Sequence, residues 1–133
     1  MEERPRRPRV VVTRRLPQPV EARMTELFDT VLNADDTAMT REALAAAMTN
    51  CDVFVPTATA AIDADLIAAA PPRLKLIANY GTGVNHIDLV AARAKAIMVT
   101  NTPGVLTDDT ADLAMSLILS VPRRLTEGSR QLY

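Results

Sequence analysis

The sequence predicts an α/β fold with a doubly wound parallel sheet. Between residues 9 and 100, short apolar runs the length of a strand alternate with segments of helical periodicity. The first run, RVVVT at residues 9–13, is β-branched and unbroken, which is typical of a strand buried on both faces. Parallel strands need crossover connections, and the alternation places a helix between successive strands.

The first half of the sheet comes with two helices. One is expected over residues 19–28, because Pro19 suits a first helical turn and apolar side chains recur on one face; these are Val20, Met24, Leu27 and Phe28. A second strand is expected at 29–33. Thr40 then caps another helix, whose expected buried stripe is Ala43, Leu44, Ala47 and Met48.

The second half follows the same pattern. Further strands are expected at residues 52–56, 74–78 and 96–100. Asp63 is expected to cap a helix through residue 70, which Pro71-Pro72 ends, and another helix should cover 88–94. Such an arrangement predicts a flavodoxin-like domain over residues 1–105.

A long apolar helix is predicted after Gly104. Thr107 or Asp108 can cap it, and it should run to residue 125 or beyond, with a kink at Pro122. Its middle, LAMSLILSV at 113–121, is apolar on nearly every side, so it requires cover in a core or at a subunit interface. The chain ends without a capping glycine or a further strand, which we interpret as a cut.

Composition argues against several classes of function. A net charge of −1 and an arginine cluster at residues 4–9 without interleaved aromatic residues argue against nucleic acid or an anionic membrane as a partner. No apolar run is long enough for a membrane-spanning helix or a signal-peptide core. Cys51 is the sole cysteine, which indicates a buried thiol in a cytoplasmic protein. No metal site is expected.

Two loops at the carboxyl edge of the predicted sheet form the candidate site: NYGTGVNH at 79–86 and NTPG at 101–104. Paired glycines expose backbone N–H groups suited to a carboxylate or phosphate, and the start of the long helix also favours anions. They are not a dinucleotide fingerprint, because His86 stands where the third glycine belongs. On glycine spacing alone, ordinary tight turns are an equally good interpretation.

The combined strings resemble the D-isomer-specific 2-hydroxyacid dehydrogenases. They are NYGTGVNHID at 79–88, VTNTPGVLT at 99–107 and TADLA at 110–114; VTRRLP at 12–17 is most similar to the glyoxylate reductase branch. The resemblance implies an oxidoreductase that uses NAD or NADP to reduce small 2-oxo acids, such as glyoxylate or hydroxypyruvate, to D-2-hydroxy acids. It further implies a substrate domain and a Rossmann cofactor domain, with the active site in the cleft between them.

The resemblance also assigns roles by position. Thr82 and Gly83 are expected to offer backbone N–H groups to the substrate carboxylate, Thr82 also to lie near the nicotinamide, and Thr110 to contact the cofactor. Residues 106–133 are expected to begin the cofactor domain, with a homodimer forming through helix 107–125.

The family's substrate-orienting Arg, its acidic partner and its acid/base His lie in the cofactor domain, which this sequence does not contain. We therefore expect no catalytic residue here and no turnover by this chain. His86 is expected to be a polar residue packed beneath the loop, and Asp88 a helix cap.

Two other interpretations were weighed. A non-catalytic ligand-binding or dimerisation module without a redox domain stays open. An FMN-binding flavodoxin is disfavoured, because the exit of the first strand lacks a phosphate loop. The choice between NADH and NADPH, and between individual 2-hydroxy acids, depends on residues outside this sequence.

Overall fold

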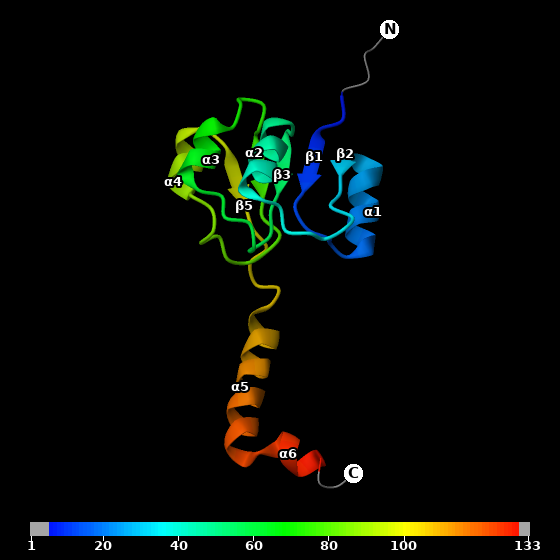
Figure 1. Cartoon of the computed structure of the whole chain (residues 1–133), viewed down its shortest axis with the longest axis vertical. Helices are drawn as coiled ribbons and strands as arrows, with labels where there is room; N and C mark the ends of the chain where they lie inside the picture. Colours follow the sequence, from blue (N-terminus) through cyan, green and yellow to red (C-terminus); the bar gives the residue numbers. More distant parts are fainter. Residues whose placement is uncertain (1–5, 131–133) are drawn as a thin grey trace. The chain divides into compact units, whose positions relative to one another are not determined.

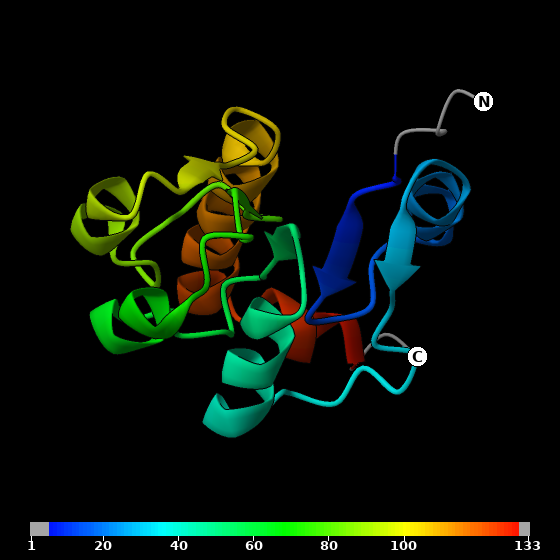
Figure 2. The same ribbon diagram turned by 90° about the horizontal axis from the view of Figure 1, so that it is seen from above.

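The computed structural model describes residues 6–130 and divides the chain into two compact units, Met1–Thr102 and Pro103–Tyr133. The first unit is built on a five-stranded parallel sheet in the order β2-β1-β3-β4-β5 (Figures 1 and 2). Its strands are β1 (Arg9–Val12), β2 (Asp29–Val31), β3 (Val53–Val55), β4 (Leu76–Ala78) and β5 (Met98–Thr100).

The strand order is that of the flavodoxin-like fold, as predicted. Each neighbouring pair is parallel: Val11 pairs with Val31 on one side and with Phe54 on the other. Every predicted strand is present, and each is shorter than predicted. All five therefore direct their carboxyl ends to one edge of the sheet, where the predicted loops lie.

Helices cover both faces of the sheet. They are α1 (Gln18–Leu27), α2 (Arg41–Thr49), α3 (Ala64–Ala69) and α4 (Leu89–Ala94). Buried residues of α2, α3 and α4 form one apolar core with the sheet, which includes Phe54 and Ile77. On the opposite face α1 packs Met24 against Val10, Val12 and neighbouring residues, and Figure 2 shows α1 apart from the other three helices.

The predicted side-chain caps of three helices are confirmed. Thr40 Oγ1 accepts a hydrogen bond from the backbone N–H of Ala43 over 3.3 Å. Asp63 Oδ1 accepts from Leu66 over 3.0 Å, and Asp88 Oδ1 accepts from Ala91 over 2.8 Å. Each cap satisfies an N–H group that lacks a partner in the first turn of its helix.

Two predicted apolar stripes need correction. In α1 no residue is fully buried, and Val20 and Leu27 are exposed, because on this face only Met24 and Phe28 reach the second core cluster. In α2 Leu44 and Met48 are buried as predicted, but Ala43 is exposed. Ala43 lies one residue before Leu44, so the helical rotation turns it away from the sheet.

The second unit consists of α5 (Thr107–Arg123) and α6 (Leu125–Arg130). The prediction that Thr107 or Asp108 caps α5 is wrong: Leu106 occupies the cap position, without a side-chain hydrogen bond. Instead of running on to residue 125, α5 ends one residue after Pro122, and Arg124 adopts a left-handed conformation.

The apolar middle of α5 is exposed in the structure. Six of its large apolar side chains are more than half exposed: Leu113, Met115, Leu117, Ile118, Leu119 and Val121. Within residues 6–130, no helix combines the length and the apolar character that a membrane crossing requires.

Candidate functional site

The loops that leave β4 and β5 are joined at the carboxyl edge of the sheet. The backbone N–H of Asn79 donates to the carbonyl of Thr100 over 2.9 Å, and the N–H of Thr102 donates to the carbonyl of Gly81 over 3.1 Å. Adjacent parallel strands end at the same edge, so their exit loops can pair in this way. The structure thus brings the predicted segments 79–86 and 101–102 together.

Side chains add two further ties between these loops. Thr82 Oγ1 donates to the carbonyl oxygen of Thr102 over 3.1 Å, and Asn101 Nδ2 donates to the carbonyl oxygen of Thr82 over 2.8 Å. The Thr82 hydroxyl has thereby used its only hydrogen. Its oxygen can still accept a hydrogen bond from a ligand.

Asn79 is the centre of the first loop. It is 3% exposed, and its Nδ2 donates to the carbonyl oxygens of Gly81 over 3.0 Å and Gly83 over 2.9 Å. Its Oδ1 lies 3.0 Å from Nε2 of His86. The amide is therefore hydrogen-bonded at both of its polar atoms, as a buried polar side chain should be.

The two asparagines determine where the loop's N–H groups point. In a trans peptide the C=O and N–H point in opposite directions, and the described chain has no cis peptide bond. Asn79 holds the carbonyls of Gly81 and Gly83, so the N–H groups of Thr82 and Val84 face away from it. Asn101 holds the carbonyl of Thr82, so the N–H of Gly83 faces away from Asn101.

These N–H groups are available to a ligand. Across residues 6–130, the N–H groups of Thr82 and Gly83 donate to no backbone or side-chain acceptor. Both residues are exposed. Successive N–H groups without partners on one loop bind anions such as a carboxylate. The predicted positions Thr82 and Gly83 thus have the geometry that such a role needs.

The glycines of the loop are not required by packing. A Cβ atom built on Gly83 would meet nothing within 4 Å, and one on Gly81 would come within 3.5 Å of Asn79 Nδ2, an ordinary contact. Neither residue has a positive φ. What the absent side chain of Gly83 provides is open space beside the exposed N–H groups.

The titratable groups nearby are engaged elsewhere. Burial lowers the pKa of His86, which favours the neutral ring, and its Nε2 faces Asn79 rather than solvent. Asp88 is the α4 cap. These positions agree with the predicted supporting roles of both residues, and no acid/base pair faces the loop among the described residues.

Cys51 is a buried thiol, as predicted. It is 0% exposed, and burial raises its pKa to about 12. The reactive form of cysteine is the thiolate, which such a site suppresses.

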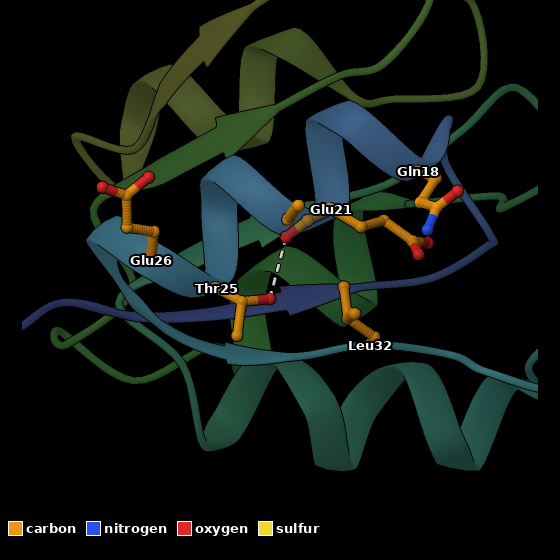
Figure 3. A pocket seen from close by; sticks show the side chains of 6 residues that line it. Gln18, Glu21, Thr25, Glu26 and Leu32 are labelled. Atoms are coloured by element: carbon orange, nitrogen blue, oxygen red, sulfur yellow. Dashed lines mark hydrogen bonds between the residues drawn. The ribbon is translucent and has the colours of Figure 1, made fainter.

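The hollows of the surface contain no second catalytic arrangement. One of about 230 Å³ adjoins the site and is lined by apolar residues together with Asn79, Tyr80 and Asn101. Another, of about 520 Å³, follows α1 from Gln18 toward Glu26 and shares no residue with the loops (Figure 3). Among the described residues no group of three metal-ligating side chains occurs.

Thr110, the third predicted site residue, lies in α5 of the second unit and is exposed. Its backbone N–H donates to the carbonyl of Leu106. Its contact with a cofactor stays a prediction. Sequence reasoning missed Asn79 and Asn101 as supports of the loop; an asparagine directly after each strand was the available signal.

Comparisons with known proteins converge on one family. The family model described as D-isomer specific 2-hydroxyacid dehydrogenase, catalytic domain, matches residues 10–131. A protein named glyoxylate reductase from Korarchaeum cryptofilum is 38% identical over 124 residues, which are 93% of this chain and 37% of that protein. The protein of the same name from Thermococcus litoralis is 40% identical over 122 residues, covering 92% and 37%.

Solved structures give the same result. A putative D-isomer specific 2-hydroxyacid dehydrogenase, NAD-binding, from Polaromonas sp. superposes with a TM-score of 0.77 at 36% identity, over 94% of this chain and 41% of that one. A 2-hydroxyacid dehydrogenase from Ketogulonicigenium vulgare gives 0.72 at 27% identity, over 93% and 38%. The chain thus spans 37% of the length of the two curated relatives above.

Proposed function

The chain belongs to the D-isomer-specific 2-hydroxyacid dehydrogenase family, and we propose that it carries the substrate-binding half of an oxidoreductase that reduces small 2-oxo acids. The substrates are of the size of glyoxylate and hydroxypyruvate, and the products are D-2-hydroxy acids. One observation carries the proposal: the N–H groups of Thr82 and Gly83 are exposed and have no partner within the described chain. The relatives named glyoxylate reductase support the choice of substrate.

The substrate carboxylate would accept hydrogen bonds from these two N–H groups. Such bonds to an ionised acceptor are short and strong. The two asparagines fix the peptide planes before the ligand arrives, so little ordering is needed on binding. Holding the carboxylate at one point leaves the adjacent 2-oxo group in a defined direction.

The cofactor would be NAD or NADP, bound mainly by a second domain outside residues 1–133. The residues present fit it in a limited way: Thr82 Oγ1 retains a free lone pair that can accept from an N–H of the nicotinamide carboxamide, and Thr110 has an exposed hydroxyl-bearing side chain. When bound, the nicotinamide supplies the hydride. Residues 1–105 then act as the substrate domain, and 106–133 begin the cofactor domain.

The proton for the substrate oxygen would come from the second domain. His86 points its Nε2 at Asn79, and Asp88 serves as a cap, so neither is free to protonate a ligand in the loop. We therefore propose that the present chain binds the substrate without converting it. Adding glyoxylate with NADH or NADPH should leave the absorbance of the reduced nicotinamide unchanged, and measurable turnover would contradict this assignment.

A titration tests carboxylate binding directly. Glyoxylate added to the ¹⁵N-labelled chain should shift the amide signals of Thr82 and Gly83 in a saturable way, with an affinity of roughly millimolar for so few contacts. Glycolaldehyde, of similar size but without a carboxylate, should not. Equal shifts from both compounds, or saturable shifts confined to another part of the chain, would refute the proposal.

A second candidate function is self-association through α5, either in the complete enzyme or in a non-catalytic module. The exposed apolar side chains of this helix favour it, because so much apolar surface is unusual on a monomer. Sedimentation velocity should show a homodimer that Leu117→Glu dissociates. A monomer at high concentration would contradict this candidate without affecting the first.

A further inference from the structure

The amide of Asn79 has to keep one of two orientations that differ by a half-turn about its last bond. An asparagine amide presents two donors on one side and an acceptor on the other, so its neighbours decide the orientation. Here two carbonyls, those of Gly81 and Gly83, face Nδ2. The ring of His86 faces Oδ1. The loop is thus closed only when all three neighbours are in place.

We infer that His86 is a positioning residue of the carboxylate loop, acting through Asn79 on the N–H groups of Thr82 and Val84. Its Nε2–H donates to Asn79 Oδ1 and completes the lock on the two loop carbonyls. This inference rests on the proposed function, because positioning has meaning only if the loop binds a carboxylate. It adds to that function a residue that does not itself touch the substrate.

The geometry determines the tautomer of His86. Both hydrogens of Asn79 Nδ2 are used by carbonyl oxygens, so Oδ1 has no hydrogen to offer and the facing ring nitrogen must carry one. The neutral ring is therefore protonated at Nε2 and keeps its lone pair on Nδ1. The opposite tautomer would set two lone pairs against each other over 3.0 Å.

The backbone beneath His86 is itself anchored. Its carbonyl accepts a hydrogen bond from the N–H of Ile62 over 2.7 Å, and the N–H of Asp88 donates to the carbonyl of Ile62 over 2.9 Å. These bonds form a parallel bridge in which Ile62 pairs with Ile87, and both of these side chains are buried. The imidazole thus connects a fixed segment of the core to the loop.

Three variants separate positioning from general stability. His86→Leu removes the donor, His86→Gln keeps an N–H within reach of Asn79 Oδ1, and Asn50→Ala removes a side chain–backbone bond of similar kind at the end of α2. We expect His86→Leu to weaken glyoxylate binding by about three- to tenfold, the size of one lost hydrogen bond. His86→Gln should restore most of the affinity, and Asn50→Ala should not change it.

Two spectroscopic readouts need no ligand. The ring nitrogens of His86 should show the neutral tautomer with the proton on Nε2. The side-chain amide protons of Asn79 should exchange slowly with solvent in the parent chain and in His86→Gln, and rapidly in His86→Leu. Thermal unfolding of all variants verifies that each is folded under the conditions of the titration.

The outcomes distinguish this inference from the function it rests on. If the parent chain binds no glyoxylate while both spectroscopic signatures are present, the proposed function fails and the lock stands as a structural feature only. If the parent binds glyoxylate and folded His86→Leu binds equally well, His86 is not a positioning residue. A proton on Nδ1 in place of Nε2 would also overturn the inference.

Discussion

Asn101 Nδ2 donates a hydrogen bond to the carbonyl oxygen of Thr82 over 2.8 Å, linking the loops that follow two neighbouring strands. The two residues are 19 positions apart in the chain. Their bond fixes the peptide plane that carries the N–H of Gly83. The arrangement makes one anion-binding group depend on a side chain from the other loop.

Removing this bond should affect binding more than stability. Asn101 is exposed, so Asn101→Ala should change the free energy of unfolding by less than about 1 kcal/mol. The N–H of Gly83 would lose its fixed direction, and glyoxylate affinity should fall by about three- to tenfold. The amide titration and a urea unfolding curve measure the two effects. Unchanged affinity in the folded variant would show that the loop is ordered without Asn101.

Gly83 offers a test in which space and stability separate. Because a Cβ atom there meets nothing within 4 Å and φ is not positive, Gly83→Ala should fold with a stability equal to the parent or higher by up to about 1 kcal/mol. Its methyl group would occupy the space beside the exposed N–H groups, so glyoxylate binding should be largely lost. A matched variant is Val90→Ala, on an α4 residue 81% exposed, which should bind normally. Normal binding by Gly83→Ala would remove the loop from the proposed site.

A buried hydroxyl predicts a stabilising substitution. Thr13 is 1% exposed, and its Oγ1 has no hydrogen-bond partner among the described residues. Thr13→Val replaces the hydroxyl with a methyl group of the same shape and should stabilise the chain by about 1 kcal/mol. Thr30→Val is the matched control, because Thr30 Oγ1 donates to the carbonyl of Met24 over 2.9 Å, and it should destabilise by a similar amount. Thermal unfolding measures both; a loss of stability in Thr13→Val would contradict the prediction.

Stability should decrease in acid through Asp52. Hydrogen bonds from the Arg73 guanidinium, and then from the backbone N–H of Arg9, lower the pKa of Asp52 to about 2. A carboxyl group whose folded pKa lies below its unfolded value, about 3.9, contributes stability that is fully present above the unfolded value. That contribution is lost as the pH falls from about 3.9 toward 2.

Urea unfolding at neutral pH and at acidic pH measures this loss. Asp52→Asn should be less stable than the parent at neutral pH, and the difference should shrink in acid. Asp35→Asn, at an exposed position, is the control and should follow the parent at both values. A pH-independent difference between Asp52→Asn and the parent would indicate that the carboxylate charge contributes nothing.

Local features were the ones that sequence reasoning placed well. The caps Thr40, Asp63 and Asp88 each bond an N–H three residues ahead, so the partners are written next to each other in the chain. The same reasoning failed for α5, where Leu106 takes the cap position in place of Thr107 or Asp108. A side chain able to cap shows only that a helix can begin there, not that it does.

Burial was predicted less well, because helical periodicity indicates an apolar face and not what covers it. Val20 and Leu27 share the apolar face of α1 with Met24, but only Met24 packs against the second core cluster. The exposure of a side chain depends on the extent of the sheet beneath its helix. That extent is a property of the assembled strands.

The sequence by itself determined the parallel α/β architecture, the helix caps and the loop with the candidate residues Thr82 and Gly83, since alternation, capping and glycine spacing act over a few residues. Only the tertiary structure decided what surrounds that loop: Asn79 holding two carbonyls, His86 completing its hydrogen bonds, and Asn101 arriving from the next strand. The physical reason is the parallel sheet, which brings the exits of two strands to one edge and lets their side chains meet across 19 residues of chain.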